Sequence, residues 1–225
     1  MSSTTYNGRV ISQTRKSKSM TRSFSGVFPI CGQGVTYESG LERDFIRSWL
    51  LDPDVVAVVA QPAQIPFTAR NGRNYIYPPD FFVHFNERSG RKPLLVEVKM
   101  REQWELNWRE WSYKWKAARR YAREQGWEFR IYDESRIRGP RLQNIDFLQR
   151  YRNLSFDPVF TEAVRKTLSL MRAAPFHHLL ALHFTGNEGI GRSHLWHLIA
   201  AGQVTADLDH ELDEHTILRA CDEGR

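Results

Sequence analysis

The residues best suited to chemistry lie around two apolar runs in the first half of the chain. Asp80 stands directly before the first run, residues 81–85. Glu97 and Lys99 end the second run, which begins at residue 94. Both runs have the length of strands and are bounded by turn-forming residues, so they predict a hairpin. Since antiparallel pairing sets the start of one strand beside the end of its partner, two carboxylates and a lysine should converge.

Two neighbouring carboxylates repel each other unless a cation binds between them, and a hard ion such as Mg²⁺ takes a few carboxylates and leaves its other positions to water and phosphate. Mn²⁺ is expected to substitute for it. A lysine beside the ion can orient or deprotonate a water, or stabilise a developing negative oxygen. This set is suited to phosphodiester hydrolysis. The plainer interpretation is an exposed Glu97–Lys99 pair on an edge strand, with Asp80 in a turn.

A helix is predicted upstream, over residues 36–51, from apolar residues at helical spacing. Ser39 and Glu42 have the spacing of a capping box, and Asp52-Pro53 ends the helix. On the residues alone, Glu42 is either a capping residue or a third carboxylate of the site.

The elements around the hairpin predict a mixed sheet with helices on its faces, an α/β fold. Residues 54–99 read as a meander of three or four strands, and residues 127–132 alternate as a further strand. Between them, a helix is predicted from residue 100 to about Gln125, which implies a right-handed crossover to a parallel strand. Its tryptophans form a stripe that we expect to pack on the sheet: Trp104, Trp108, Trp111 and Trp115.

The same helix is rich in cations, and it starts directly after Lys99. These cations are candidates for phosphate contacts, although a solvated helix face would look the same. The candidates on this helix are Arg109, Lys114, Lys116, Arg119 and Arg120.

Pro79-Asp80 followed by Glu97-Val98-Lys99 resembles the motif of the PD-(D/E)xK nuclease superfamily, which has the restriction-endonuclease-like fold. Residues 38–45 and Gln61-Pro62 resemble the amino-terminal segment of TnsA-type endonucleases. The resemblance covers residues 36 to about 135. It implies that Asp80, Glu97 and Glu42 bind Mg²⁺ and that Lys99 positions the attacking water. Glu38, one helical turn earlier, is the alternative to Glu42.

The TnsA resemblance also implies a subunit of a heteromeric bacterial transposase that nicks double-stranded DNA on the 5′ side of transposon ends. Its partners would be a TnsB-type DDE transposase and a TnsC-type ATPase regulator. Two other functions remain open. One is a stand-alone repair, resolvase or phage endonuclease of the same fold, and the other is a DNA-binding assembly adaptor.

Three domains are expected: a flexible basic arm (1–26), the nuclease domain (27–150) and a carboxy-terminal domain (151–225). Residues 135–153 read as a connector. Three helices and a small hairpin suggest a winged helix, whose third helix would present Arg192, Ser193, His194 and His197 outward, with Arg192 a candidate DNA contact. Because seven acids lie within residues 204–224, contact with protein is at least as well supported there.

Composition is compatible with a polyanion partner, since the 225-residue chain has a net charge of +6. No apolar run has the roughly 20 residues of a membrane span, and no signal peptide is recognisable, so we expect no membrane contact and a cytoplasmic protein. Cys31 and Cys221 form no metal-binding or disulfide pattern, and we expect free buried thiols.

Overall fold

A computed structural model describes residues 2–15 and 24–221 of the chain. It divides into two compact units, Met1–Ile137 and Arg138–Arg225. The first unit ends at Ile137, whereas the sequence predicts a nuclease domain that extends to residue 150. The segment interpreted as a connector contains two helices, α3 (Glu134–Ile137) and α4 (Pro140–Gln149), the second of which begins with proline at its first position.

The first unit holds most of the strands. Its elements before α3 are β1 (Ser3–Tyr6), β2 (Arg9–Ser12), β3 (Gly26–Ile30), β4 (Gln33–Tyr37), α1 (Gly40–Arg47), β5 (Val55–Ala60), β6 (Ile65–Thr68), β7 (Asn74–Tyr77), β8 (Phe81–Phe85), the 3₁₀ helix η1 (Glu87–Ser89), β9 (Leu94–Val98), α2 (Arg101–Glu124) and β10 (Glu128–Tyr132).

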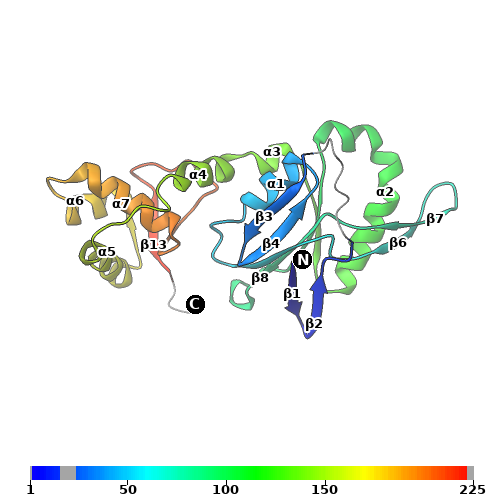
Figure 1. Cartoon of the computed structure of the whole chain (residues 1–225), viewed down its shortest axis with the longest axis horizontal. Helices are drawn as coiled ribbons and strands as arrows, with labels where there is room; N and C mark the ends of the chain where they lie inside the picture. Colours follow the sequence, from blue (N-terminus) through cyan, green and yellow to red (C-terminus); the bar gives the residue numbers. More distant parts are fainter. Residues whose placement is uncertain (1, 16–23, 222–225) are drawn as a thin grey trace. The chain divides into compact units, whose positions relative to one another are not determined.

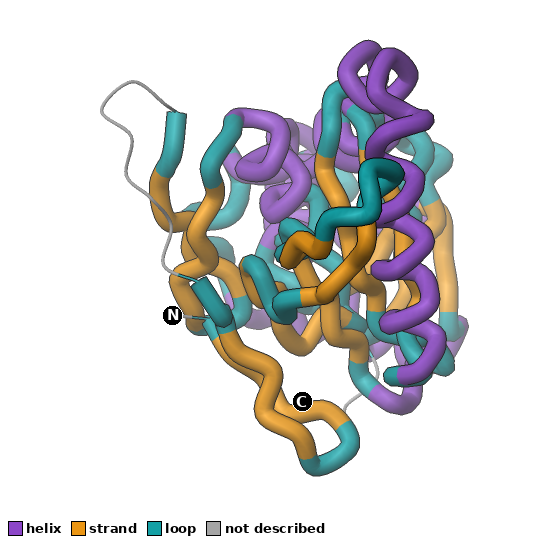
Figure 2. Tube along the Cα trace, turned by 90° about the vertical axis from the view of Figure 1, so that its right-hand side faces the viewer, coloured by secondary structure: helices purple, strands orange, loops and turns teal. Residues whose placement is uncertain are grey.

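A four-stranded mixed sheet in the order β10-β9-β8-β5 forms the centre of this unit. β8 pairs antiparallel with β5 and β9, and β10 pairs parallel with β9 across the α2 crossover, as predicted. β8 and β9 are buried along their whole length, because both faces of the sheet are covered. Phe45 and Ile46 of α1 pack on one face, and Trp115 and Ala118 of α2 pack on the other (Figure 2).

Three expectations for this region are wrong. β6 and β7 do not join a meander but form a separate two-stranded ribbon between β5 and β8. The predicted helix 36–51 is shortened to α1, because the residues before it pair as the β3–β4 hairpin. The third concerns one tryptophan of the stripe: Trp115 is buried and Trp104 and Trp111 pack against the core as predicted, but Trp108 is 54% exposed.

The hairpin β1–β2 replaces part of the expected flexible arm. Asn7 and Gly8 both have positive φ, the backbone that a two-residue hairpin turn requires. The hairpin is attached to the body of the unit: the Ser2 hydroxyl accepts from the Ala60 N–H at 3.2 Å, and the Thr4 hydroxyl bonds the His84 ring at 2.8 Å. Residues 16–23 of the predicted arm, with Lys16, Lys18 and Arg22, lie outside the described residues.

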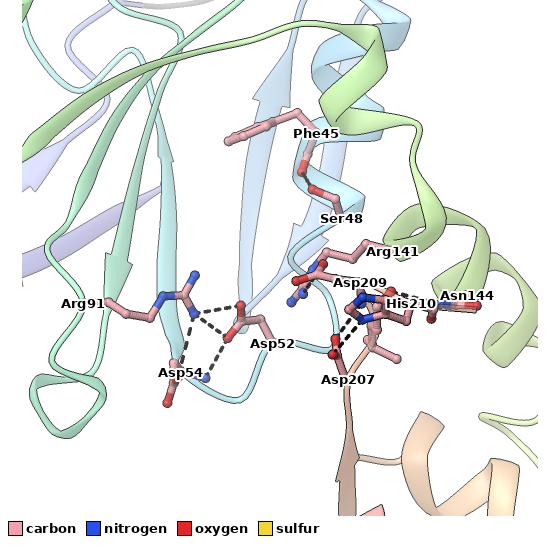
Figure 3. Close-up of polar contacts among 11 residues, drawn as sticks. Phe45, Ser48, Asp52, Asp54, Arg91, Arg141, Asn144, Asp207, Asp209 and His210 are labelled. Atoms are coloured by element: carbon pink, nitrogen blue, oxygen red, sulfur yellow. Dashed lines mark hydrogen bonds and ion pairs between the residues drawn. The ribbon is translucent and has the colours of Figure 1, made fainter. Parts of the chain in front are cut away.

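The end of α1 is fixed by polar contacts in the same unit. The Ser48 hydroxyl donates to the Phe45 carbonyl at 2.7 Å. Arg91 donates to both carboxylate oxygens of Asp52, at 2.9 and 3.1 Å, in the turn before β5 (Figure 3). The first contact closes the last turn of α1, and the second ties the turn before β5 to the loop before β9.

The second unit is helical with a small sheet. After α4 it contains α5 (Pro158–Met171), β11 (Ala173–Pro175), α6 (Phe176–His183), α7 (Glu188–Ala200), β12 (Val204–Ala206) and β13 (Ile217–Ala220). The three strands pair antiparallel in the order β11-β13-β12. The Asn144 side chain of α4 holds the acidic segment that follows β12. It donates to the carbonyls of Leu208 and His210, at 2.9 and 2.7 Å (Figure 3).

Two further expectations are corrected by burial. His194 does not face outward on α7, because it is 1% exposed and stacks on Phe156 with ring centroids 4.5 Å apart. Cys31 is exposed rather than buried, since it forms the turn between β3 and β4 together with Gly32. Among the residues described, no helix is long and apolar enough to span a membrane.

Candidate active site

The strands β8 and β9 bring Asp80 and Glu97 together as predicted. Phe81 pairs with Val96, so Asp80, the residue before β8, lies beside the end of β9. There the Val98 N–H donates to Asp80 Oδ2 at 2.7 Å. Because this donor belongs to the backbone of the central sheet, the Asp80 carboxylate is held in place by the fold itself.

Lys99 lies between the two carboxylates. Its Nζ is 3.6 Å from Asp80 Oδ2 and 3.6 Å from Glu97 Oε1. The Lys99 N–H donates to the Tyr132 carbonyl at 3.1 Å, which extends the pairing of β9 with β10 by one residue. The lysine therefore emerges from the sheet at the point where both carboxylates can reach its ammonium.

Glu97 is 1% exposed, and its partners come from two other elements. The Tyr77 hydroxyl of β7 donates to Oε2 at 2.5 Å, and Lys114 Nζ of α2 lies 2.8 Å from Oε1. Lys114 also lies over the ring of Tyr77, at 4.9 Å, and that of Trp111, at 4.8 Å. Sequence reasoning did not assign Tyr77 to the site, although it stands three residues before Asp80 in an aromatic run.

Glu42 forms the predicted capping box at the start of α1. Its N–H donates to the Ser39 hydroxyl at 3.1 Å, and its Oε2 accepts from the Glu38 N–H at 2.7 Å. The Glu42 charge also acts on both Asp80 and Lys99, whereas the charge of Glu38 acts on Glu42 itself. Of the two glutamates, Glu42 is thus the one whose charge affects the pKa of Asp80 and of Lys99.

Gln61 links the surroundings of the site through an unusual backbone. Its φ is 44°, a left-handed value that is uncommon for a residue other than glycine. In this conformation its N–H donates to the Asp80 carbonyl at 2.8 Å, and its side chain donates to Glu38 at 3.4 Å. The Gln61-Pro62 bend is therefore hydrogen-bonded both to the backbone of Asp80 and to the side chain of Glu38.

Burial and like charges dominate the electrostatics. Burial raises the pKa of Asp80 well above its usual value, and the neighbouring charge of Glu97 raises it further. Burial also raises the pKa of Glu42. Burial alone would lower the pKa of Lys99, but the surrounding carboxylates outweigh it and raise the pKa, which favours the ammonium form. Burial likewise raises the pKa of the Tyr77 hydroxyl, so this group donates as a neutral phenol.

The donor set fits a hard divalent cation in its chemistry, because burial and the neighbouring charges of Glu97 and Glu42 raise the pKa of Asp80, and added positive charge would stabilise its carboxylate. The ligands are not gathered in advance. Within residues 2–15 and 24–221, no three acidic, histidine or cysteine side chains are close enough to hold an ion as placed. The oxygens of Glu97 are engaged by Tyr77 and Lys114, and those of Glu42 by its helix cap.

The predicted phosphate contacts divide into three groups. Lys114 faces inward and holds Glu97, so its assignment to DNA is replaced by a role in the site. Arg192 of α7 forms an ion pair with Glu214, which leaves no excess positive charge at that point. The remaining cations are exposed along α2: Arg109, Lys116, Arg119 and Arg120.

The first unit has a mixed sheet flanked by helices, with Asp80 before one strand and Glu97 and Lys99 at the end of the next, an arrangement consistent with a nuclease fold. Residues 52–134 match the family model described as TnsA-like endonuclease N terminal, so this stretch is similar to the amino-terminal domain of TnsA-type endonucleases. Asp80, Glu97 and Lys99 lie inside the matched stretch, and Glu42 lies before it. No curated protein matches the chain by sequence.

Proposed function

We propose that this chain is the Mg²⁺-dependent endonuclease subunit of a heteromeric transposase, which nicks double-stranded DNA on the 5′ side of transposon ends. The observation that carries the proposal is the position of Lys99 Nζ, 3.6 Å from a carboxylate oxygen of both Asp80 and Glu97, within the stretch that matches the TnsA-like model. Two carboxylates and a lysine fixed by one sheet are what metal-assisted attack on a phosphodiester requires.

Asp80 and Glu97 would hold Mg²⁺, or Mn²⁺ in its place, and Glu42 would complete the protein ligands. When bound, the ion would neutralise charge on the phosphate and lower the pKa of a water. To join this set, Glu42 would exchange its hydrogen bonds from Ser39 and the Glu38 N–H for the ion.

The other residues of the site orient and stabilise. Lys99, kept as an ammonium, orients the attacking water and stabilises the negative charge that develops on the phosphate oxygens. Tyr77 and Lys114 fix the Glu97 carboxylate, and the Val98 N–H fixes that of Asp80. Preorganised donors of this kind act without rearrangement during the reaction.

The second unit supports the proposal through its topology. Its elements follow the order helix, strand, helix, helix, strand, strand, from α5 to β13, with the last strand central in the sheet. We assign it as a winged helix. Because Arg192 is paired with Glu214 and His194 is buried, we infer that this unit contacts the TnsB-type transposase or the TnsC-type ATPase rather than DNA.

The test is cleavage of transposon-end DNA by the purified full chain in Mg²⁺, alone and with the transposase and ATPase encoded beside it. Asp80→Ala should abolish cutting, and Lys99→Ala should slow it at least about a hundredfold. Glu124→Ala is the matched control, since it removes an exposed carboxylate at the far end of α2.

Cutting that needs the partners and is lost in Asp80→Ala supports the proposal. Cutting by the chain alone replaces it with a stand-alone nuclease. Normal cutting by Asp80→Ala would refute the assigned site, and DNA binding without cutting under every condition would leave an assembly adaptor.

A further inference from the structure

The ribbon formed by β6 and β7 is anchored at one end and free at the other. At its base, Ile65 is 3% and Tyr77 5% exposed, and the Tyr77 hydroxyl donates to Glu97. From Arg70 to Ile76 every residue is exposed. Figure 1 shows the ribbon running past α2 and ending beyond it. The anchored end is thus part of the candidate active site, while the other end reaches into solvent.

The tip is closed and carries only positive charge. The Ala69 N–H donates to the Arg73 carbonyl at 2.9 Å, and the Thr68 hydroxyl donates to the Asn74 side chain at 2.8 Å. Between Gln61 and Pro79 the sequence contains two arginines, Arg70 and Arg73, and no acid. Within the described part of the chain, neither guanidinium has a hydrogen-bond or ion-pair partner.

Apolar side chains flank these arginines. Tyr75 is 44% exposed and stacks on Phe67 with ring centroids 5.8 Å apart, and Ile76 is 64% exposed. A two-stranded ribbon by itself is marginally stable in water, and here only its base packs against the body, where β6 contacts α2. The tip is therefore outside the packed part of the unit, and its two solvated guanidinium groups are accessible to a ligand.

The size and charge of the ribbon fit double-stranded DNA. The major groove admits a two-stranded β-ribbon, and the guanidinium fork matches phosphate geometry. Arg73 directly precedes β7 and stands four residues before Tyr77, which is about 13 Å if the chain is extended at strand spacing. That distance corresponds to roughly four nucleotides along one DNA strand.

We propose that the β6–β7 ribbon is a DNA-docking arm, in which Arg70 and Arg73 bind backbone phosphates about four nucleotides from the phosphate held at Asp80 and Glu97. The ribbon sets the register of the duplex, because its anchored end also holds Glu97. This inference rests on the proposed function for the identity of the phosphate that is cut. Binding of DNA by the tip does not depend on cleavage.

The first experiment measures binding to a short duplex in the absence of divalent metal, between about 50 and 200 mM salt. Arg70→Gln/Arg73→Gln should bind more weakly than the unaltered chain at low salt, and the slope of log affinity against log salt should fall by about 1.8. The difference in affinity should therefore shrink about tenfold across this salt range. Arg88→Gln/Lys92→Gln is the matched control, because it removes two exposed cations beyond the other end of β8. Unchanged thermal melting would show that all variants fold.

An unchanged slope in the arm variant, or an equal loss in the control, would overturn the inference. So would unchanged DNA affinity combined with loss of binding to the transposase or the ATPase, since the tip would then be a protein contact.

A second experiment replaces single phosphates by neutral methylphosphonates. Replacement about four nucleotides from the cut site should weaken binding by the unaltered chain but not by the arm variant. Cutting with no difference between arm and control variants would reject the arm and leave the nuclease proposal intact. A difference in binding without any cutting would reject the nuclease proposal and leave the arm intact.

Discussion

Glu97 in the first unit and His194 in the second are equally buried, each 1% exposed, yet their surroundings differ. Glu97 has a phenol, two ammonium groups and a second carboxylate around it. The His194 ring has the hydroxyl of Thr161 at 2.8 Å, the stacked ring of Phe156, and the tilted ring of Phe184 with centroids 5.4 Å apart. The second arrangement satisfies a polar group locally without net charge.

The difference lies in the free energy of folding of the two units. Like charges buried together in the first unit cost free energy that a simple apolar core would avoid, which is common at sites that perform chemistry. In the second unit, the buried polar residues Asn144 and His194 hold helices and the acidic segment in place. Three substitutions or conditions test this contrast.

The largest effect is expected for Lys114→Met. It removes the 2.8 Å contact to Glu97 and leaves a buried carboxylate short of positive charge, so the free energy of unfolding should fall by about 3 kcal/mol. Urea unfolding followed by tryptophan fluorescence measures it. Lys116→Met is the control, an exposed lysine on the same helix. Adding Glu97→Gln should recover most of the loss, and equal effects of both lysine variants would contradict the contrast.

A smaller effect is expected for Asn144→Ala in the second unit. It leaves the carbonyls of Leu208 and His210 without their amide donor, at a cost of about 2 kcal/mol. Hydrogen exchange should quicken in the second unit and not at β8 or β9. Gln143→Ala, an exposed neighbour on α4, serves for comparison, and faster exchange there too would point to α4 itself.

The smallest effect is a dependence of stability on pH through His194. Burial lowers the pKa of this ring, so the unfolded chain binds a proton at a higher pH than the folded one. The contribution is fully present above about pH 6.5, the usual histidine value, and is lost as the pH falls from there through the lower pKa of the folded state. Chemical unfolding at pH 7.5 and 5.5 should show this loss, reduced in His194→Gln. An equal loss in that variant would assign it to other histidines.

The sequence was most informative where local pattern and tertiary structure agree. The strands 81–85 and 94–98, the α2 crossover and the Ser39–Glu42 cap follow from alternation, helical spacing and a four-residue motif. Asp80, Glu97 and Lys99 could therefore be placed at one point without a structure.

What could not be predicted depends on packing between distant segments. Lys114 was predicted as a phosphate contact because a helical stripe does not reveal the rotation that turns one lysine toward Glu97. His194 was predicted to face outward, and this is wrong because α7 is buried on more than one side. The β1–β2 strands are four residues long and polar, yet their Asn7-Gly8 turn was a usable signal that was passed over.

The attachment of β1–β2 has a consequence for the order of events during protein synthesis. The hairpin is synthesised before its partners Ala60 and His84, which emerge from the ribosome only after tens of further residues. Domains form as units once their long-range contacts are available, so the β1–β2 hairpin must remain undocked while the central strands are translated. Pausing of the ribosome before residue 84 would lengthen the time that its unpaired edges are open to aggregation.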